Sequence, residues 1–400
     1  MVTTTLKLYR DSFRGLSKEI WWLALITFIN RAGTMVIPFL SLYLKDELKF
    51  DLSHVGWIMS AFGVGSFLGS FLGGKLTDKI GFYKVMFWSL LSTGFCFILL
   101  QYVTSFYGFL LSVFFTMLIA DTFRPAIFVS LKAYSKPENQ TRSLTLIRLA
   151  INLGFSFGPF IGGIIIATLS YKGLFWIDGI TCILAVLLFR FVLKEKEFHK
   201  KTVDTDEHDE NKSVFRDHPY WIFLIIVFIM GFVFMQLFST IPLFYKDVHT
   251  LTEVQIGLLM SLNGAIIFLT EMPIIHRLEQ SSFNKISIIL WSMVLFAISY
   301  LLLNVTGGGA VILIISMIII TFGEMLAFPF GNAFAMTRAV RGKEGLYMAL
   351  YSMAFSMAHI FSAKTGMEII ARFGFSMNWY LMGLLSLIAV FLSYRLKKML

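Results

Sequence analysis

Residues 73–84 read GGKLTDKIGFYK, a glycine-rich and basic stretch that joins two long apolar runs, 54–76 and 85–103. About 20 mostly apolar residues in a helix are enough to cross the hydrocarbon of a bilayer, so each run can be a membrane span. Lys75, Lys79 and Lys84 put positive charge in the turn, and positive charge collects in cytoplasmic loops. The stretch therefore predicts two membrane-spanning helices joined on the cytoplasmic side.

The composition of the whole chain extends this prediction. Hydrophobic residues make up 57% of the 400 residues and charged residues 14%, against about 45–50% and about 25% in soluble proteins. A water-soluble fold could not bury that much apolar surface, so the composition excludes a water-soluble protein. Twelve apolar runs lie near 21–44, 54–76, 85–103, 106–131, 142–169, 173–193, 220–244, 253–275, 284–304, 309–334, 345–367 and 376–394. We expect an all-α integral membrane protein with twelve transmembrane helices.

The basic residues predict a topology. With the N-terminus inside, most of the 34 lysines and arginines fall in cytoplasmic tails and loops. Those on the outer side are Lys45, Lys49, Lys172, Lys246 and Arg372. By the positive-inside rule, both termini are cytoplasmic. The net charge of +10 is then a topology signal that can also attract anionic lipid, and we expect no nucleic-acid partner.

One long polar segment divides the chain. It covers 194–219, and it separates six runs from six runs, which predicts an N-terminal six-helix bundle at 1–193 and a C-terminal one at 220–400. Two such bundles suit a ligand site between them near the midplane. His199, His208 and His218 fit no metal-binding spacing, so we interpret 194–219 as a solvated cytoplasmic linker. Cys96 and Cys182 lie inside apolar runs and are expected to be buried free thiols, with no disulfide and no metal site.

The turn at 73–84 resembles the signature loop of the major facilitator superfamily, G-x-x-x-D-[RK]-x-G-[RK]-[RK]. The matching residues are Gly74, Asp78, Lys79, Gly81 and Lys84, whereas Phe82 and Tyr83 depart from the basic end of the motif. The resemblance implies the twelve-helix fold of that superfamily, transport by alternating access, and a cytoplasmic gate at these residues. We expect Gly74 to let two helices approach closely, Asp78 to accept hydrogen bonds from a helix N-terminus, and Gly81 to permit the tight turn.

The run 142–169 contains a second motif. Its residues are Gly154, Gly158, Pro159, Gly162 and Gly163, and they are similar to part of a motif associated with antiporters of the superfamily. Thr145 stands where that motif has a further glycine. Pro159 removes a helix hydrogen bond and the glycines allow close packing, so we expect a bendable helix; ordinary helix packing without a link to transport is the alternative.

Ionisable groups inside the apolar runs are costly and are interpreted as functional by default. They are Arg31 beside Asn30, Asp121 with Arg124, Arg148 with Asn152, Glu271 and Glu324. Asp121 and Arg124 are three residues apart on one helix face and can pair, in a structural role or in coupling. Arg148 is shallow enough to snorkel towards the cytoplasm. Asp178 and Lys364 lie near outer ends, where we expect interfacial roles.

We predict that Glu324 carries a proton, with Asp121 and Glu271 as further candidates. A carboxyl group in a low-dielectric cavity favours its neutral form, and the approach of Arg31 or Arg124 would favour its charged form. Glu271 lies deep in its run, so a structural role at the inner end is the alternative. The predicted substrate cavity comprises Arg31, Asn30, Arg124, Arg148, Asn152, Gln236, Asn263, Tyr347, Tyr351 and His359.

Two branches of the superfamily share features with this chain. The glycine-proline motif is similar to that of drug:proton antiporters, although Ser112 stands near the place of their usual arginine. Proton-coupled oligopeptide transporters are similar at Arg31-x-Gly33, Arg124-Pro125, Ile151-Asn152-x-Gly154 and Gly323-Glu324. Thr27 and Asn30, however, stand where that group has two glutamates.

These resemblances imply proton-coupled transport by alternating access, with efflux of amphiphilic compounds by proton antiport as the first hypothesis. Uptake of peptides or other small organic solutes by symport is the alternative, and a membrane receptor or enzyme is a third class. We expect no cofactor beyond the proton gradient, a small-molecule substrate, protons and the lipid bilayer as partners, and a monomer. The expected location is the plasma membrane, which is the inner membrane if the source is bacterial.

Overall fold

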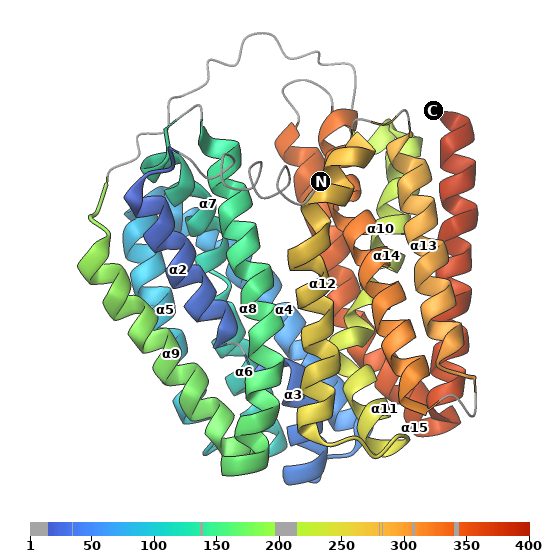
Figure 1. Ribbon diagram of the computed structural model, residues 1–400, viewed down its shortest axis with the longest axis horizontal. Helices are drawn as coiled ribbons and strands as arrows, with labels where there is room; N and C mark the ends of the chain where they lie inside the picture. The colour runs from blue at the N-terminus through green and yellow to red at the C-terminus, as the bar shows by residue number, and fades with distance from the viewer. Residues whose placement is uncertain are drawn as a thin grey trace, which may run out of the picture. The chain divides into compact units, whose positions relative to one another are not determined.

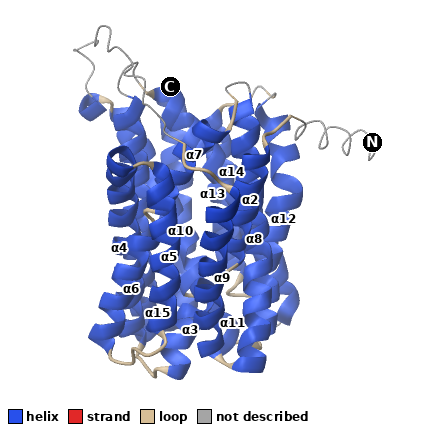
Figure 2. Cartoon of the chain, turned by 90° about the vertical axis from the view of Figure 1, so that its left-hand side faces the viewer, coloured by secondary structure: helices blue, strands red, loops and turns tan. Residues whose placement is uncertain are grey.

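The computed structural model describes residues 15–33, 35–136, 139–196, 214–279, 281, 283–305, 309–339 and 344–400. Most of the predicted linker, with His199 and His208, lies outside this part of the chain. Every regular element among the described residues is a helix, and no strand occurs among them (Figure 2). The prediction of an all-α protein is therefore confirmed.

Eleven helical segments in the described residues are long and apolar enough to cross a membrane. They are Lys18–Glu47, Leu52–Ile80, Phe82–Leu100, Phe106–Leu131, Arg142–Leu169, Tyr171–Val192, His218–Asp247, Glu253–Leu278, Lys285–Leu302, Gly309–Arg338 and Leu346–Met399. The last belongs to α15 (Glu344–Met399), which is interrupted at Gly374, where φ is 81° and ψ is 173°. The predicted runs 345–367 and 376–394 lie on either side of Gly374. The count of twelve spans and the cytoplasmic termini stay predictions.

The helices form two compact units, 1–36 with 64–200 and 37–63 with 201–400. The first unit contains α2 (Lys18–Ala32), α5 (Phe82–Leu100), α6 (Phe106–Ala120), α7 (Phe123–Tyr134), α8 (Gln140–Leu169) and α9 (Tyr171–Val192) (Figure 1). The second contains α10 (His218–Ser239), α11 (Ile241–Asp247), α12 (Glu253–Glu279), α13 (Lys285–Leu302), α14 (Gly309–Arg338) and α15. α3 (Val36–Leu42) begins at the boundary, and α4 (Leu52–Ile80) contributes to both units. The domain boundary at 194–219 stays a prediction.

Segment 37–63 belongs to the second unit because it packs closely against α15. The hydroxyl of Ser60 donates to the carbonyl of Ile360 over 2.6 Å. A Cβ on Gly56 would lie 3.0 Å from Cα of Lys364, and one on Gly63 would lie 3.1 Å from Cα of Ile360. Glycine at both positions therefore lets the two backbones approach, which α-helical side chains would otherwise prevent.

Three spans that the sequence predicts as single runs are interrupted. α2 ends at Ala32 and α3 begins at Val36; α6 ends at Ala120 and α7 begins at Phe123; α10 ends at Ser239 and α11 begins at Ile241. Backbone groups released inside a membrane must find partners within the protein. At the second and third breaks, backbone bonds persist, because the N–H of Asp121 donates to the carbonyl of Met117 and that of Thr240 to the carbonyl of Gln236, each over 3.0 Å. At the first break, a side chain replaces the helix hydrogen bonds.

Asp178 supplies this replacement at the first break. Its carboxylate accepts from the backbone N–H groups of Met35 at 3.0 Å and Val36 at 2.8 Å, and the residue is fully buried. A carboxylate at a helix N-terminus is stabilised by the unpaired N–H groups there. The prediction of an interfacial role for Asp178 is thus wrong. Although Asp178 lies towards one end of α9, its carboxylate contacts the break between α2 and α3.

Candidate functional site

Three charged residues of the first unit gather at its two helix breaks. Arg31 lies in the last turn of α2, and the charges of Asp121 and Arg124 act on its guanidinium. Its guanidinium carbon lies 5.9 Å from the centre of the Phe155 ring on α8. Residues that the sequence places in spans 1, 4 and 5 therefore lie in one neighbourhood of this unit.

The glycine-proline motif of α8 seats Arg31. A Cβ on Gly154 would lie 2.6 Å from Cβ of Arg31, and one on Gly158 would lie 3.2 Å from the carbonyl oxygen of Ala32. Side chains at these two positions would push α2 away. Gly162 and Gly163 are buried, and α8 continues as a helix through Pro159. The close packing predicted for the motif is confirmed at Gly154 and Gly158.

Asp121 and Arg124 form the predicted ion pair, with 3.6 Å between Oδ1 of Asp121 and Nη2 of Arg124. The pair lies in the break between α6 and α7 rather than on one continuous helix, and the N–H of Arg124 donates to the carbonyl of Asp121 over 3.3 Å. The hydroxyl of Ser66 on α4 also donates to Asp121. Ser66 was missed because a serine between Gly65 and Gly69 carries no sequence signal beyond helix packing.

Asn30 has a thiol as its partner. Its amide donates to the sulfur of Cys182 on α9 over 3.6 Å, and both side chains are buried. Cys96 and Cys182 are both free, as predicted, but only Cys182 is fully buried; Cys96 is half-buried. Asn30 therefore helps to hold α2 against α9 beside Arg31.

The second unit holds a different constellation, built on α12 and α14. The amide of Asn263 donates to Oε2 of Glu324 over 2.8 Å and to the hydroxyl oxygen of Thr321 over 3.0 Å. Thr321 in turn donates to the carbonyl of Met317. Glu271 lies two turns after Asn263 on α12, is buried, and its charge acts on Glu324. Asn263, Glu271 and Glu324 thus share one neighbourhood, and Thr321 is the member that sequence reasoning missed.

Two predicted cavity residues take part in hydrogen bonds between helices. Gln236 is fully buried, and its amide donates to the carbonyl and hydroxyl of Ser362 while its oxygen accepts from Thr240 and Asn378. These bonds satisfy the amide at the break between α10 and α11. The role of Gln236 in a substrate cavity stays a prediction.

Tyr347 is the second of these residues. Its hydroxyl donates to Asp217 over 3.1 Å, and Arg338 donates to the same carboxylate over 2.8 and 3.0 Å. The cluster stands at the start of α10, where Asp217 caps the helix by accepting from the N–H of Tyr220. Burial is the largest single influence and raises the pKa of Asp217, but the hydrogen bonds from Arg338, Tyr220 and Tyr347 and the charge of Arg338 together outweigh it, so the pKa of the carboxyl lies below its usual range. Tyr347 thus joins a helix cap, and its role in a substrate cavity stays a prediction.

The remaining cavity candidates are half-buried. Arg148 and Asn152 are four residues apart on α8. The ring of Tyr351 stacks on Phe223 at 6.1 Å, and the ring of His359 lies 5.3 Å from that of Phe62. The role of these four residues in substrate binding stays a prediction.

The turn at 73–84 shows which glycine serves which purpose. Gly81 has φ of 87°, so the prediction that it permits the turn is confirmed. The expectation for Gly74 is wrong, because no described atom lies within 4 Å of where its Cβ would stand. Close approach occurs one residue earlier, where a Cβ on Gly73 would lie 2.6 Å from Cα of Thr122. Asp78 and Lys79 are exposed, and Lys84 lies 3.8 Å from Glu195.

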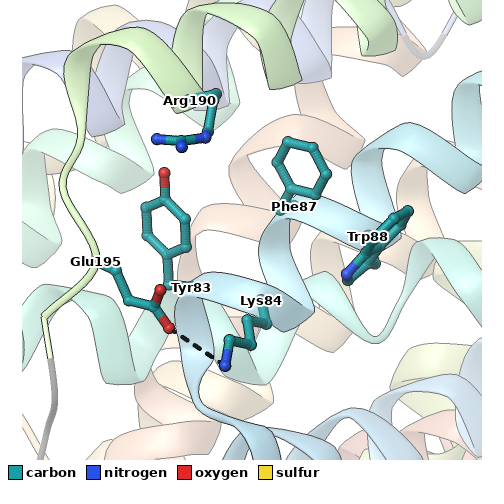
Figure 3. A pocket seen from close by; sticks show the side chains of 6 residues that line it. All are labelled: Tyr83, Lys84, Phe87, Trp88, Arg190 and Glu195. Atoms are coloured by element: carbon teal, nitrogen blue, oxygen red, sulfur yellow. Dashed lines mark ion pairs between the residues drawn. The ribbon is translucent and has the colours of Figure 1, made fainter.

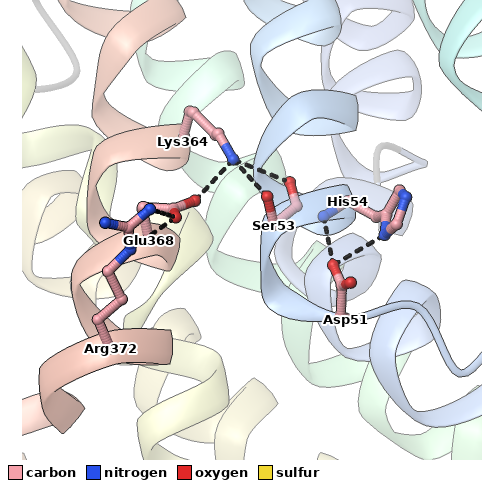
Figure 4. A network of polar contacts seen from close by, with 6 residues as sticks. All are labelled: Asp51, Ser53, His54, Lys364, Glu368 and Arg372. Carbon is pink, nitrogen blue, oxygen red and sulfur yellow. Dashed lines mark hydrogen bonds and ion pairs between the residues drawn. The ribbon is translucent and has the colours of Figure 1, made fainter.

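A polar network joins the start of α4 to α15, at the end of α4 that lies away from the turn at 73–84 (Figure 4). The amine of Lys364 donates to the hydroxyl of Ser53 over 2.5 Å and to Glu368 over 2.8 Å, and Arg372 pairs with Glu368. The N–H of His54 donates to Asp51 and keeps the pKa of that carboxyl below its usual range. Lys364 thus holds segment 37–63 on the second unit.

The described residues contain no group of three or more His, Cys, Asp or Glu side chains placed to hold a metal ion. The spanning helices are apolar and long enough to cross a membrane, and three of the predicted spans are interrupted. The family model of the Major Facilitator Superfamily matches residues 23–363, and the chain belongs to that superfamily.

Several relatives support this assignment over most of the chain. An uncharacterized MFS-type transporter, YqjV of Bacillus subtilis, is 25% identical over 387 residues, which cover 92% of this chain and 90% of YqjV. A Na(+), Li(+), K(+)/H(+) antiporter of Planococcus maritimus is 22% identical over 91% of this chain and 92% of its own. The quinolone resistance protein NorA of Staphylococcus aureus is 22% identical over 80% of this chain and 82% of its own.

Solved structures show the same fold. A transporter of the POT family in complex with 5-aminolevulinic acid has a TM-score of 0.78 at 16% identity, covering 95% of this chain and 96% of its own. The nucleoside transporter NupG has a TM-score of 0.74 at 15% identity, covering 95% of this chain and 99% of its own. The chain is therefore a multi-pass transporter of the plasma membrane, as expected.

Proposed function

We propose that this transporter is a proton-coupled antiporter that exports amphiphilic compounds by alternating access, with Glu324 as the proton carrier. The observation that carries the proposal is that Glu324, a partly buried carboxyl group, has a neutral hydrogen-bond partner, the amide of Asn263 at 2.8 Å. No cofactor beyond the proton gradient is needed, and a single chain is sufficient.

The choice of Glu324 follows from its surroundings. Burial favours the neutral form of a carboxyl group, whereas a hydrogen bond donated by Asn263 favours the ionised form. Neither the burial nor the hydrogen bond acts as strongly as a full opposite charge would. Modest changes in solvation during a transport cycle can therefore shift the equilibrium between the neutral and the ionised carboxyl group. Asp121, in contrast, pairs with the guanidinium of Arg124, which is a full opposite charge.

Efflux is the direction that we propose, for two reasons. The glycine motif that seats Arg31 is similar to the antiporter motif, and its packing is present at Gly154 and Gly158. Two relatives also carry names that fit export, a quinolone resistance protein and a cation/proton antiporter.

The test is proton-driven transport of a lipophilic cation dye in proteoliposomes. Glu324→Gln keeps the shape and a hydrogen-bond acceptor but cannot release a proton, so gradient-driven accumulation should fall at least tenfold while counterflow exchange of the dye persists. Glu253→Gln is a matched control at the first residue of α12, where Glu253 pairs with Lys246. Undiminished accumulation by the Glu324 variant would refute the role of Glu324.

A second candidate is exchange of monovalent cations for protons. It is favoured by the buried Glu271 and the partly buried Glu324, two acids in one neighbourhood, and by the antiporter of Planococcus maritimus. Addition of Na⁺ or K⁺ to acid-loaded vesicles would then collapse the pH gradient without dye. Uptake of peptides by symport would instead make the outside more alkaline when peptide is added.

A further inference from the structure

A pocket of about 220 Å³ lies in the first unit where α5 begins and α9 ends (Figure 3). Its lining residues are Tyr83, Lys84, Phe87, Trp88, Arg190 and Glu195. None of them belongs to the charge clusters at the helix breaks. We propose that this pocket binds the phosphate headgroup of an anionic phospholipid.

The two cations of the pocket lie at one level of the membrane. α5 and α9 meet at Gly94 and Gly179, where a Cβ on either glycine would lie 2.8 or 2.7 Å from the carbonyl oxygen of the other. Lys84 precedes Gly94 by two to three turns, and Arg190 follows Gly179 by about three turns, which is about 15 Å in both cases. The helices run in opposite directions, so both cations stand at the boundary that the charge distribution assigns to the cytoplasm.

The wall of the pocket is held in place by the chain that leaves α9. The hydroxyl of Tyr83 donates to the carbonyl of Leu193 over 3.1 Å, and the Tyr83 ring lies 4.6 Å from that of Phe189. The hydroxyl of Tyr134 donates to the carbonyl of Lys194 over 2.6 Å. Residues 193–195 therefore have a defined position beside α5, and the pocket is a built feature.

One of the two cations in the pocket is available to bind an anion. Lys84 lies 3.8 Å from Glu195, a distance at the loose end of an ion pair. Among the described residues, no carboxylate pairs with the Arg190 guanidinium, which Figure 3 shows facing the Tyr83 hydroxyl. Two cations against one carboxylate give the pocket a net positive charge. A guanidinium is well suited to the planar, bidentate recognition of a phosphate group.

The surface beside the pocket selects a lipid over a free anion. Trp88 is 58% exposed and Phe191 is 85% exposed, although both lie within apolar spanning helices. Apolar side chains that are exposed in a spanning segment face acyl chains, and tryptophan favours the boundary between hydrocarbon and headgroups. A ligand with a phosphate head and an apolar tail would use both surfaces, whereas inorganic phosphate would use only the cations.

The test is a titration of the purified full-length chain with phosphatidylglycerol, with bound lipid counted by native mass spectrometry. Because one basic residue contributes about fivefold in affinity for an anionic lipid, Arg190→Gln should weaken binding about fivefold. Glu195→Gln removes the opposing charge and should strengthen binding by a similar factor. Lys172→Gln changes a cation at the other end of α9 and should leave the affinity unchanged.

Two additional ligands show whether the pocket binds the phosphate of a lipid or that of a small soluble molecule. Phosphatidylcholine, which has no net charge, should bind more weakly than phosphatidylglycerol, and glycerol phosphate, which has no tail, should not compete. The proposal is overturned if Arg190→Gln and Glu195→Gln bind phosphatidylglycerol like the unaltered chain, or if glycerol phosphate competes at equal concentration. A general folding defect cannot imitate opposite shifts in the two variants, and the result is independent of proton coupling at Glu324.

Discussion

Asp121 and Glu324 are the same chemical group in two different settings. Asp121 lies in a helix break of the first unit, beside the guanidinium of Arg124 and the hydroxyl of Ser66. Glu324 lies inside an uninterrupted helix of the second unit and is bonded to a neutral amide. We expect the first setting to serve a structural task, because the partner of the carboxylate is a full positive charge, and the second to suit a proton carrier, because the partner is a neutral amide. A buried acid is a candidate proton carrier only when its partner is not a full opposite charge.

The largest effect that would sharpen this comparison is expected from Asp121→Asn. The substitution leaves the half-exposed guanidinium of Arg124 at the break without its counter-charge. Gradient-driven transport and counterflow should both be lost, in contrast to Glu324→Gln. The measurements are dye exchange in proteoliposomes and thermal unfolding in detergent. Normal counterflow by this variant would contradict the structural task.

An intermediate effect is expected from Gly73→Ala. The new Cβ would stand 2.6 Å from Cα of Thr122, at the break that contains Asp121. Overpacking of this kind costs about 2 kcal/mol. Gly74→Ala is the matched control, because the adjacent site has no described atom within 4 Å of the new carbon. Thermal unfolding should separate the two variants clearly, and equal unfolding temperatures would show that the break tolerates displacement.

The smallest effect is expected from Asn263→Ala. Loss of its hydrogen bond removes stabilisation of the ionised form of Glu324, and a change of about 1.4 kcal/mol corresponds to about one pH unit. The pH at which proton-driven transport is half-maximal should therefore rise by about one unit, while Asn263→Gln should shift it less. A pH profile that stays in place would mean that Asn263 does not set the protonation of Glu324.

The predictions from the sequence were confirmed where the predicted feature depends on a single helix or turn. The length of the apolar runs required spanning helices, the positive φ of Gly81 followed from the turn, and Asp121 and Arg124 paired because they are near in sequence. The contacts of Gln236, Tyr347 and Asp178 were not predicted, for the opposite reason. Their tasks depend on Ser362, Asp217 and Met35, which lie 126, 130 and 143 residues away along the chain.

The sequence by itself determined the solvent of this protein, the number and place of its apolar runs, and which charges had to be explained. Hydrophobic length and the cost of a charge in lipid are local properties, so they can be read along the chain. Only the tertiary structure decided where the spans break, that Gly73 rather than Gly74 packs closely, and that Glu324 meets an amide while Asp121 meets a guanidinium. These outcomes depend on which helix faces meet, and that choice is made by the packing of the whole unit.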